Sequence, residues 1–223
     1  MKGRIAEVFD SVQGEGIYLG EKQIFVRFFG CNLSCKYCDT KLNHFTEYEP
    51  VELFEEIKMY DDAYHSISFT GGEPLLQNDF LREVLKLTHQ AGYKNYLETN
   101  GTLSGELKDM IDYVDIIAMD LKLPSSTLMG NMWGFHSRFL KVASQKDVFL
   151  KTIICDSTTE ADFKEALKFM KESDGGMVLV LQPDSFTSSI GLKEKIENFR
   201  TLCLLENVTS CVIPQMHKMV GIQ

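Results

Sequence analysis

The chain has 223 residues, of which 44% are hydrophobic, and its formal net charge at pH 7 is −9. This length can bury a substantial core, and we expect residues 1–223 to form a single domain. The negative charge gives no long-range attraction to nucleic acid or to an anionic membrane surface, so neither is expected as a partner. The N-terminal segment has no apolar signal region, and no run approaches the ~18 apolar residues of a membrane span.

Apolar runs alternate with amphipathic stretches along nearly the whole chain. Strands are predicted at residues 23–29, 67–70, 95–99, 115–120, 148–154, 177–182 and 209–213. Repeated strand–helix units imply a parallel sheet with right-handed crossovers. Six or seven strands are too few for a closed eight-stranded barrel. The sequence therefore predicts an α/β fold with an open, partial (β/α) barrel of six to seven mainly parallel strands.

Helices are predicted from hydrophobic periodicity between these strands. One covers residues 51–60 and the last covers residues 192–205. Asn78 or Asp79 is the expected N-cap of another, and Thr159 begins a further helix in the manner of a capping box. Residues 124–133 are rich in Ser, Met and Gly and are predicted to form a mobile loop.

Three cysteines follow the first of these strands: Cys31, Cys35 and Cys38, with the spacing C-x3-C-x2-C. Three thiolates on one short loop can ligate three irons of a 4Fe–4S cluster and leave the fourth iron open. Clusters that only transfer electrons normally have four protein ligands, so the open iron is expected to bind a further ligand and take part in chemistry. The alternative is zinc, with His44 completing a Cys3His site, although structural zinc favours paired C-x2-C units.

The other three cysteines, Cys155, Cys203 and Cys211, are widely spaced and are expected to be buried thiols. Six cysteines with three in one cluster do not make a disulfide framework for a chain of this size. Reduced thiols beside an iron–sulfur cluster indicate a cytoplasmic protein.

Polar residues follow the carboxyl ends of the predicted strands. They lie in the cysteine loop and at residues 70–74, 99–101, 120–122, 182–183 and 214–215. In α/β barrels and open parallel sheets, ligands bind at this edge. We therefore expect these segments to form one site.

The sequence resembles radical S-adenosylmethionine (SAM) enzymes, because the cysteine motif is followed, after the next strand, by GGEP at residues 71–74. It resembles more narrowly the 7-carboxy-7-deazaguanine synthase family of the queuosine and archaeosine pathways. The narrower resemblance rests on SVQGEG at 11–16, FVR at 25–27, CDT at 38–40, ETNG at 98–101 and PQMHK at 214–218. These motifs extend over essentially the whole chain.

The resemblance implies a 4Fe–4S cluster on Cys31, Cys35 and Cys38, with SAM bound to the open iron and cleaved to a radical after one-electron reduction. The SAM contacts that it implies are Gly71, Gly72, Glu73, Thr99, Asn100, Asp120, Lys122 and Gln182. Where the family has Ser-Pro-Lys, this chain has Asp120-Leu121-Lys122. For Lys122 and Gln182, an ordinary polar residue at a strand end is the alternative interpretation.

The substrate implied by the resemblance is 6-carboxy-5,6,7,8-tetrahydropterin, whose ring contracts with loss of ammonia. The substrate contacts that it implies are Val12, Gln13, Gly14, Glu15, Arg27, Thr70, His217 and the α-carboxylate of Gln223. The Arg27 guanidinium can pair with the carboxylate as a fork, and a structural ion pair is the alternative. The resemblance also implies Mg²⁺ on Thr40, where Asp39 either assists or braces the loop.

Two other functions compete with this interpretation. A glycyl-radical enzyme activase would share the cysteine loop but act on a protein, and an iron–sulfur electron carrier would bind a cluster without cleaving SAM. A zinc-binding interaction module is a further alternative.

The resemblance implies two kinds of partner, a one-electron reductant such as flavodoxin or ferredoxin and a second copy of the chain in a homodimer.

Overall fold

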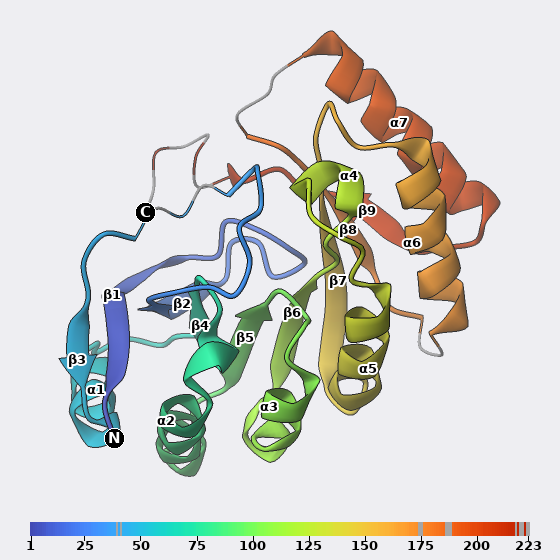
Figure 1. The fold of residues 1–223 in the computed structure, drawn as a ribbon. Coiled ribbons are helices and arrows are strands. Elements are labelled where there is room, and N and C mark those ends of the chain that lie inside the picture. Colours follow the sequence, from blue (N-terminus) through green and yellow to red (C-terminus); the bar gives the residue numbers. More distant parts are fainter. Residues whose placement is uncertain are drawn as a thin grey trace.

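The computed structural model describes residues 1–38, 40, 42–173, 176–185, 189–216, 218 and 221. The described residues form nine strands in one sheet of order β3-β1-β2-β4-β5-β6-β7-β8-β9 (Figure 1). The strands are β1 (Gly3–Val12), β2 (Lys22–Phe28), β3 (Thr46–Tyr48), β4 (Ser66–Gly71), β5 (Asn95–Thr99), β6 (Ile116–Asp120), β7 (Asp147–Ile154), β8 (Leu179–Pro183) and β9 (Ser210–Val212). Strand β2 and strands β4 to β9 are each parallel to their neighbours in this series. Strand β1 is antiparallel to both β2 and β3.

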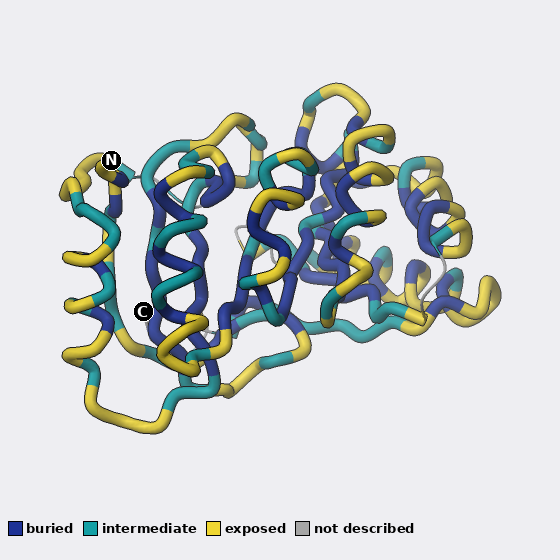
Figure 2. Tube along the Cα trace, turned by 90° about the horizontal axis from the view of Figure 1, so that it is seen from below, coloured by how far each residue is buried: buried dark blue, intermediate teal, exposed yellow. Residues whose placement is uncertain are grey.

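Helices follow most of the strands and cover one face of the sheet (Figure 1). They are α1 (Pro50–Ile57), α2 (Asn78–Gln90), α3 (Ser104–Lys108), α4 (Pro124–Thr127), α5 (Trp133–Ala143), α6 (Glu160–Glu172) and α7 (Ile190–Leu205), with 3-10 turns η1 (Pro74–Gln77) and η2 (Ile111–Tyr113). Figure 2 shows buried residues along the strands and exposed residues on the outer sides of the helices. Within the described part of the chain, no helix is both long enough and apolar enough to cross a bilayer.

The predicted α/β fold is confirmed. The seven predicted segments overlap β2 and β4 to β9, with ends that differ by up to two residues. Strands β1 and β3 were not predicted. The burial of β1 alternates irregularly between buried, intermediate and exposed residues, which blurs the period-two pattern, and β3 is only 3 residues long. Both lie at the antiparallel edge of the sheet.

The predicted starts of two helices have different outcomes. Thr159 is the N-cap of α6 as predicted, and its hydroxyl accepts a hydrogen bond from the Asp162 backbone N–H at 3.3 Å. The capping box is not completed, because the Asp162 carboxylate accepts from the Ser125 backbone N–H and the Thr159 backbone N–H donates to the Ser125 hydroxyl. The prediction of Asn78 or Asp79 as a cap is wrong, because η1 runs directly into α2 and makes Gln77 the N-cap. Part of the predicted loop at 124–133 is the short helix α4.

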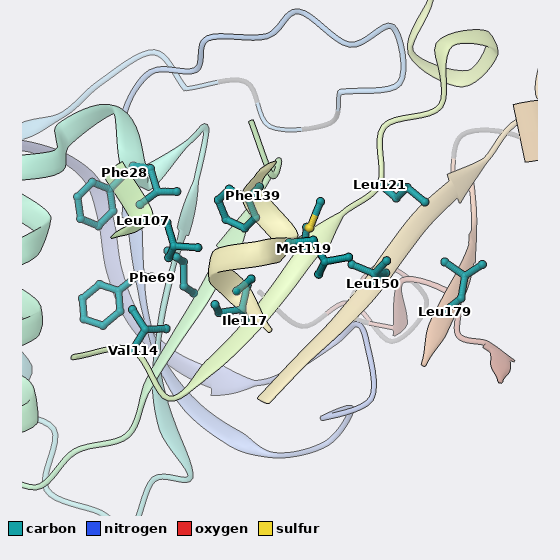
Figure 3. Packing of buried hydrophobic residues seen from close by; sticks show 14 of the residues in the cluster. Phe28, Phe69, Leu107, Val114, Ile117, Met119, Leu121, Phe139, Leu150 and Leu179 are labelled. Atoms are coloured by element: carbon teal, nitrogen blue, oxygen red, sulfur yellow. The ribbon is translucent and has the colours of Figure 1, made fainter. Parts of the chain in front are cut away.

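The main core lies between the sheet and its helices. Figure 3 shows strand residues such as Phe28, Phe69 and Ile117 together with Leu107 of α3 and Phe139 of α5, all of them fully buried. Burying a leucine or phenylalanine side chain contributes about 1.5–3 kcal/mol, so this layer is the main source of stability.

The opposite face of the sheet carries a second, smaller core, which the β1–β2 connection covers. Tyr18 of this connection packs its ring 5.8 Å from that of Tyr96 and 6.3 Å from that of Phe149, and its hydroxyl donates to Asp147. Gly16 has a φ of +68°, and a Cβ there would lie 2.6 Å from the Phe149 ring, so a larger residue would not fit. The packing fixes where residues 13–15 lie.

Candidate active site

A cavity of about 360 Å³ lies at the carboxyl ends of the parallel strands. Most of the predicted site residues line it, although they come from segments far apart in the sequence. These are Val12, Gln13, Gly14, Glu15, Arg27, Cys31, Cys35, Cys38, Thr40, Thr70, Gly71, Gly72, Thr99, Asn100, Asp120, Lys122 and Gln182. The predicted positions Asp39, His217 and Gln223 lie outside the described residues.

The cysteine loop follows β2 and packs against Gly71 and Gly72, at the end of β4. A Cβ at Gly71, where φ is +129°, would lie 2.3 Å from the carbonyl oxygen of Phe28. A Cβ at Gly72 would lie 2.0 Å from the carbonyl oxygen of Gly30. Both glycines are therefore required for the close approach of the two segments, and the Glu73 backbone N–H donates to the Gly30 carbonyl at 2.9 Å.

Glu73 is fully buried behind this segment and does not line the cavity. Its carboxylate accepts hydrogen bonds from the Thr99 hydroxyl at 2.9 Å, the Asn100 backbone N–H at 2.7 Å and the Leu75 backbone N–H at 3.1 Å. Burial raises the pKa of Glu73 to about 7, although the three hydrogen bonds act to lower it. In this structure Glu73 joins the ends of β4 and β5, and its contact with SAM stays a prediction.

A chain of alternating charges, from Glu15 to Lys122, lines the cavity. The Lys151 ammonium hydrogen-bonds to Glu15 and lies 3.4 Å from Asp120, whose other oxygen is 2.7 Å from the Lys122 ammonium. Burial opposes charge on all four groups. The opposite charges nevertheless lower the pKa values of both carboxyl groups and raise those of both lysines well above the ordinary value.

A second polar network, centred on Glu98, lies beside these charges. The Glu98 carboxylate accepts hydrogen bonds from the Thr70 hydroxyl at 2.9 Å and from the Gln13 side-chain amide at 2.9 Å. The Gln13 amide oxygen accepts in turn from the Glu15 backbone N–H at 3.0 Å. Three predicted substrate contacts thus belong to one hydrogen-bonded group.

Arg27 lines the cavity and also forms an ion pair. Its Nε donates to Glu7 at 2.8 Å, and its guanidinium lies 5.6 Å from the centre of the Phe9 ring. The sequence left a ligand clamp and a structural ion pair as alternatives. The geometry is compatible with both, because Glu7 engages Nε at the side of the guanidinium rather than its two terminal amino groups.

Comparison with known proteins places this site in a family. The radical SAM superfamily profile matches residues 25–184. A 7-carboxy-7-deazaguanine synthase of Geobacter sulfurreducens is 33% identical over 97% of this chain and 96% of its own length. One from Archaeoglobus fulgidus is 32% identical over 100% of both chains. The chain belongs to the 7-carboxy-7-deazaguanine synthase family of radical SAM proteins.

The fold agrees with this family membership. The crystal structure of QueE from Escherichia coli superposes with a TM-score of 0.66, at 20% identity, and covers 95% of this chain and 93% of its own. At that identity the likeness supports the fold alone. Membership in the radical SAM superfamily implies a 4Fe–4S cluster and SAM.

The residues present fit these groups. The three family cysteines line one cavity, next to the glycine segment that lies against their loop. Among the described residues, no three His, Cys, Asp or Glu side chains converge on a single ion. Three thiolates that line one cavity suit a cluster, in which each thiolate binds its own iron. Gln182 is fully buried on the cavity wall, and both polar atoms of its amide lack a hydrogen-bond partner among the described residues, so a bound ligand would supply one.

Sequence reasoning missed three residues of this family site. Glu98 belongs to a quoted motif but received no role, although a charged residue in the strand 95–99 was a visible signal. Lys151 gave the same signal, a charged residue in the predicted strand 148–154, whereas Glu7 gave none. Only the fold places these two residues beside Glu15 and Arg27. Of the remaining cysteines, Cys155 and Cys203 are buried as predicted and Cys211 is half-buried.

Proposed function

We propose that this chain converts 6-carboxy-5,6,7,8-tetrahydropterin to 7-carboxy-7-deazaguanine with release of ammonia, in 7-deazapurine biosynthesis. The observation that carries the proposal is that two sets of family motifs line one cavity. One set contains the cysteine loop and the glycine segment, and the other contains residues 12–15, Arg27 and Thr70. Full-length similarity to synthases from a bacterium and an archaeon supports the same activity.

One side of the cavity would hold the cofactors. Cys31, Cys35 and Cys38 would ligate the cluster, and Gly71, Gly72, Thr99, Asn100, Asp120, Lys122 and Gln182 would surround SAM. When bound, the reduced cluster and SAM together supply the radical that abstracts a hydrogen atom from the substrate. Lys122 is held by Asp120 and lies 5.3 Å from the centre of the Tyr37 ring, so its charge is fixed beside the cysteine loop.

The other side of the cavity would hold the pterin. The terminal amino groups of Arg27 would pair with the substrate carboxylate. The Glu15 and Glu98 carboxylates would accept hydrogen bonds from the N–H groups of the pterin edge, while Val12, Gln13, Gly14 and Thr70 would complete the pocket. The lowered pKa of Glu15, which Lys151 holds down against burial, keeps it an acceptor at neutral pH.

Residues near the end of the sequence would close the pterin side. The Met216 backbone N–H donates to the Gly14 carbonyl at 2.9 Å, and the Gln215 amide donates to Glu15 at 2.5 Å. His217 follows directly, and we propose it and Gln223 as further substrate contacts.

The proposal includes further components. Thr40 lines the cavity beside Cys38 and would provide one oxygen ligand to Mg²⁺, with substrate and water completing the octahedron. A flavodoxin or ferredoxin would deliver the electron. The active protein would be a cytoplasmic homodimer of single-domain chains.

The test is anaerobic reconstitution with iron and sulfide, followed by incubation with SAM, a reductant and the carboxylated tetrahydropterin. Formation of the deazaguanine, identified by its mass, is expected. Cleavage of SAM without turnover of the pterin would favour a glycyl-radical activase, and a cluster that never cleaves SAM would favour an electron carrier. A Cys35→Ala variant should lose SAM cleavage, whereas Cys203→Ala, which alters a buried thiol on α7, should retain it.

A further inference from the structure

Three side chains form a closed hydrogen-bonded ring between the cysteine loop and the connection that follows β5. The Asn100 amide nitrogen donates to the Asn32 amide oxygen at 2.8 Å, and the Asn32 nitrogen donates to the Thr102 hydroxyl at 2.9 Å. The Thr102 hydroxyl closes the ring by donating to the Asn100 oxygen at 2.6 Å. Each amide uses both its oxygen and its nitrogen in the ring. Rotating either amide by 180° would therefore place two donors or two acceptors opposite each other.

The ring also directs the side-chain N–H group of Asn100 toward the sulfur of Cys31. The Asn100 side-chain nitrogen lies 4.0 Å from the Cys31 sulfur, and the Leu33 backbone N–H donates to the same sulfur at 3.4 Å. An amide NH2 group has two protons, so Asn100 can donate to Asn32 and to the sulfur at once. Asn100 is only 5% exposed, and its backbone N–H is held by Glu73 at 2.7 Å. This donor is therefore held in orientation on a largely buried side chain, and the Cys31 sulfur that it faces is exposed.

We propose that Asn100 donates a hydrogen bond to the cluster sulfur of Cys31 and raises the reduction potential of the cluster, and that Asn32 and Thr102 hold Asn100 in position. Hydrogen bonds to the sulfur ligands are among the features that set the potential of an iron–sulfur cluster, because they stabilise the more negative, reduced form. The proposal rests on the cluster assignment made for this family. Asn32 and Thr102, which have no role in the proposed reaction as described above, would thus act as positioning residues for Asn100.

The test measures the potential of the anaerobically reconstituted cluster by redox titration, following the spectrum of the reduced state without SAM. Omitting SAM separates this role from any contact between Asn100 and SAM. Asn100→Ala removes the donor, and the potential should become more negative. Thr102→Val keeps the side-chain volume but opens the ring, and should shift the potential in the same direction by less. Thr201→Val, on the distant helix α7, is the matched control and should leave the potential unchanged.

The second measurement is the rate at which an iron chelator bleaches the cluster. Opening the ring frees Asn32, so Thr102→Val should bleach faster than the parent protein while Thr201→Val should not. An unchanged potential in Asn100→Ala overturns the proposed donor. If that variant does not retain a cluster, an unchanged potential in Thr102→Val overturns the proposal instead. Failure of the parent protein to take up a cluster would count against the proposed function itself.

Discussion

Arg27 and Thr70 are register partners on the adjacent parallel strands β2 and β4. Paired residues of parallel strands point to the same face of a sheet, so both side chains face the cavity from neighbouring positions. Thr70 is tied to Glu98 and Arg27 to Glu7. The cavity wall thus presents a cation beside a hydrogen-bonded carboxylate, which suits a ligand that has an acidic group at one end and N–H donors at the other.

Replacing Arg27 with lysine should weaken substrate binding by roughly tenfold or more, because lysine keeps the charge but loses the planar fork. SAM affinity should hardly change. Isothermal titration with each ligand separately measures both effects, and Arg200→Lys on the exposed side of α7 is a matched control. If the affinities for both ligands fall together, Arg27 acts through the fold and the clamp interpretation is wrong.

The sequence predicted the parallel strands well because their buried runs are long and apolar. It also predicted that the motif residues share one edge, since parallel strands bring their carboxyl ends together. It could not predict the partners of those residues. Lys151 lies inside a correctly predicted strand, but its partner Glu15 is 136 positions earlier in the sequence. Glu15 reaches the Lys151 ammonium only because the β1–β2 connection packs on the face of the sheet opposite the helices.

Glu7 offers a test with two opposite outcomes. In Glu7→Gln the amide oxygen can still accept from the Arg27 Nε, but the negative charge that competes with the substrate carboxylate is gone. Substrate affinity should then rise by roughly two- to fivefold, the range expected for a partly exposed ion pair. In Glu7→Ala the guanidinium loses its anchor, and affinity should fall. Equal losses in both variants would mean that Glu7 only stabilises strand β1.

Lys151 should be important for stability because its buried ammonium is shared by two carboxylates that are themselves largely shielded from water. Lys151→Met leaves Glu15 without a counter-charge and Asp120 with Lys122 alone, and the free energy of unfolding should fall by about 3–5 kcal/mol. Adding Glu15→Gln removes the charge that Lys151→Met leaves unpaired, so the double variant should be more stable than Lys151→Met alone. Urea denaturation of the three proteins measures this coupling. A double variant that is less stable than Lys151→Met would contradict the ionic chain.

The difference between the parent protein and Lys151→Met should depend on pH. The pKa values of Glu15 and Asp120 are lowered in the folded parent. Their contribution to stability is therefore present at a pH above their pKa values in the unfolded chain, and it is lost as the pH falls through their lower pKa values in the folded protein. In Lys151→Met these pKa values should rise. The gap in stability between the two proteins should therefore be widest near neutral pH and narrow as the solution becomes acidic.

His136 should make the fold sensitive to mild acid. Its ring is fully buried on α5 beside Trp133 and Phe169, and neither nitrogen makes a well-formed hydrogen bond to a described residue, although the Asn100 backbone opposes part of the effect of burial. Burial lowers its pKa from 6.5 to about 4. The unfolded chain therefore binds a proton at a higher pH than the folded chain does. Stability is fully present above pH 6.5 and declines as the pH falls toward 4, by roughly 3 kcal/mol at most.

His136→Phe keeps an aromatic ring in this aromatic pocket and removes the titrating group. The variant should lose less stability than the parent between pH 6.5 and pH 4, measured as the midpoint of thermal unfolding across that range. His89→Phe is the matched control, because His89 lies at the exposed end of α2, and it should follow the parent profile. Superimposable profiles for the parent and His136→Phe would show that the acid sensitivity arises elsewhere, since the two proteins differ only in that one buried ring.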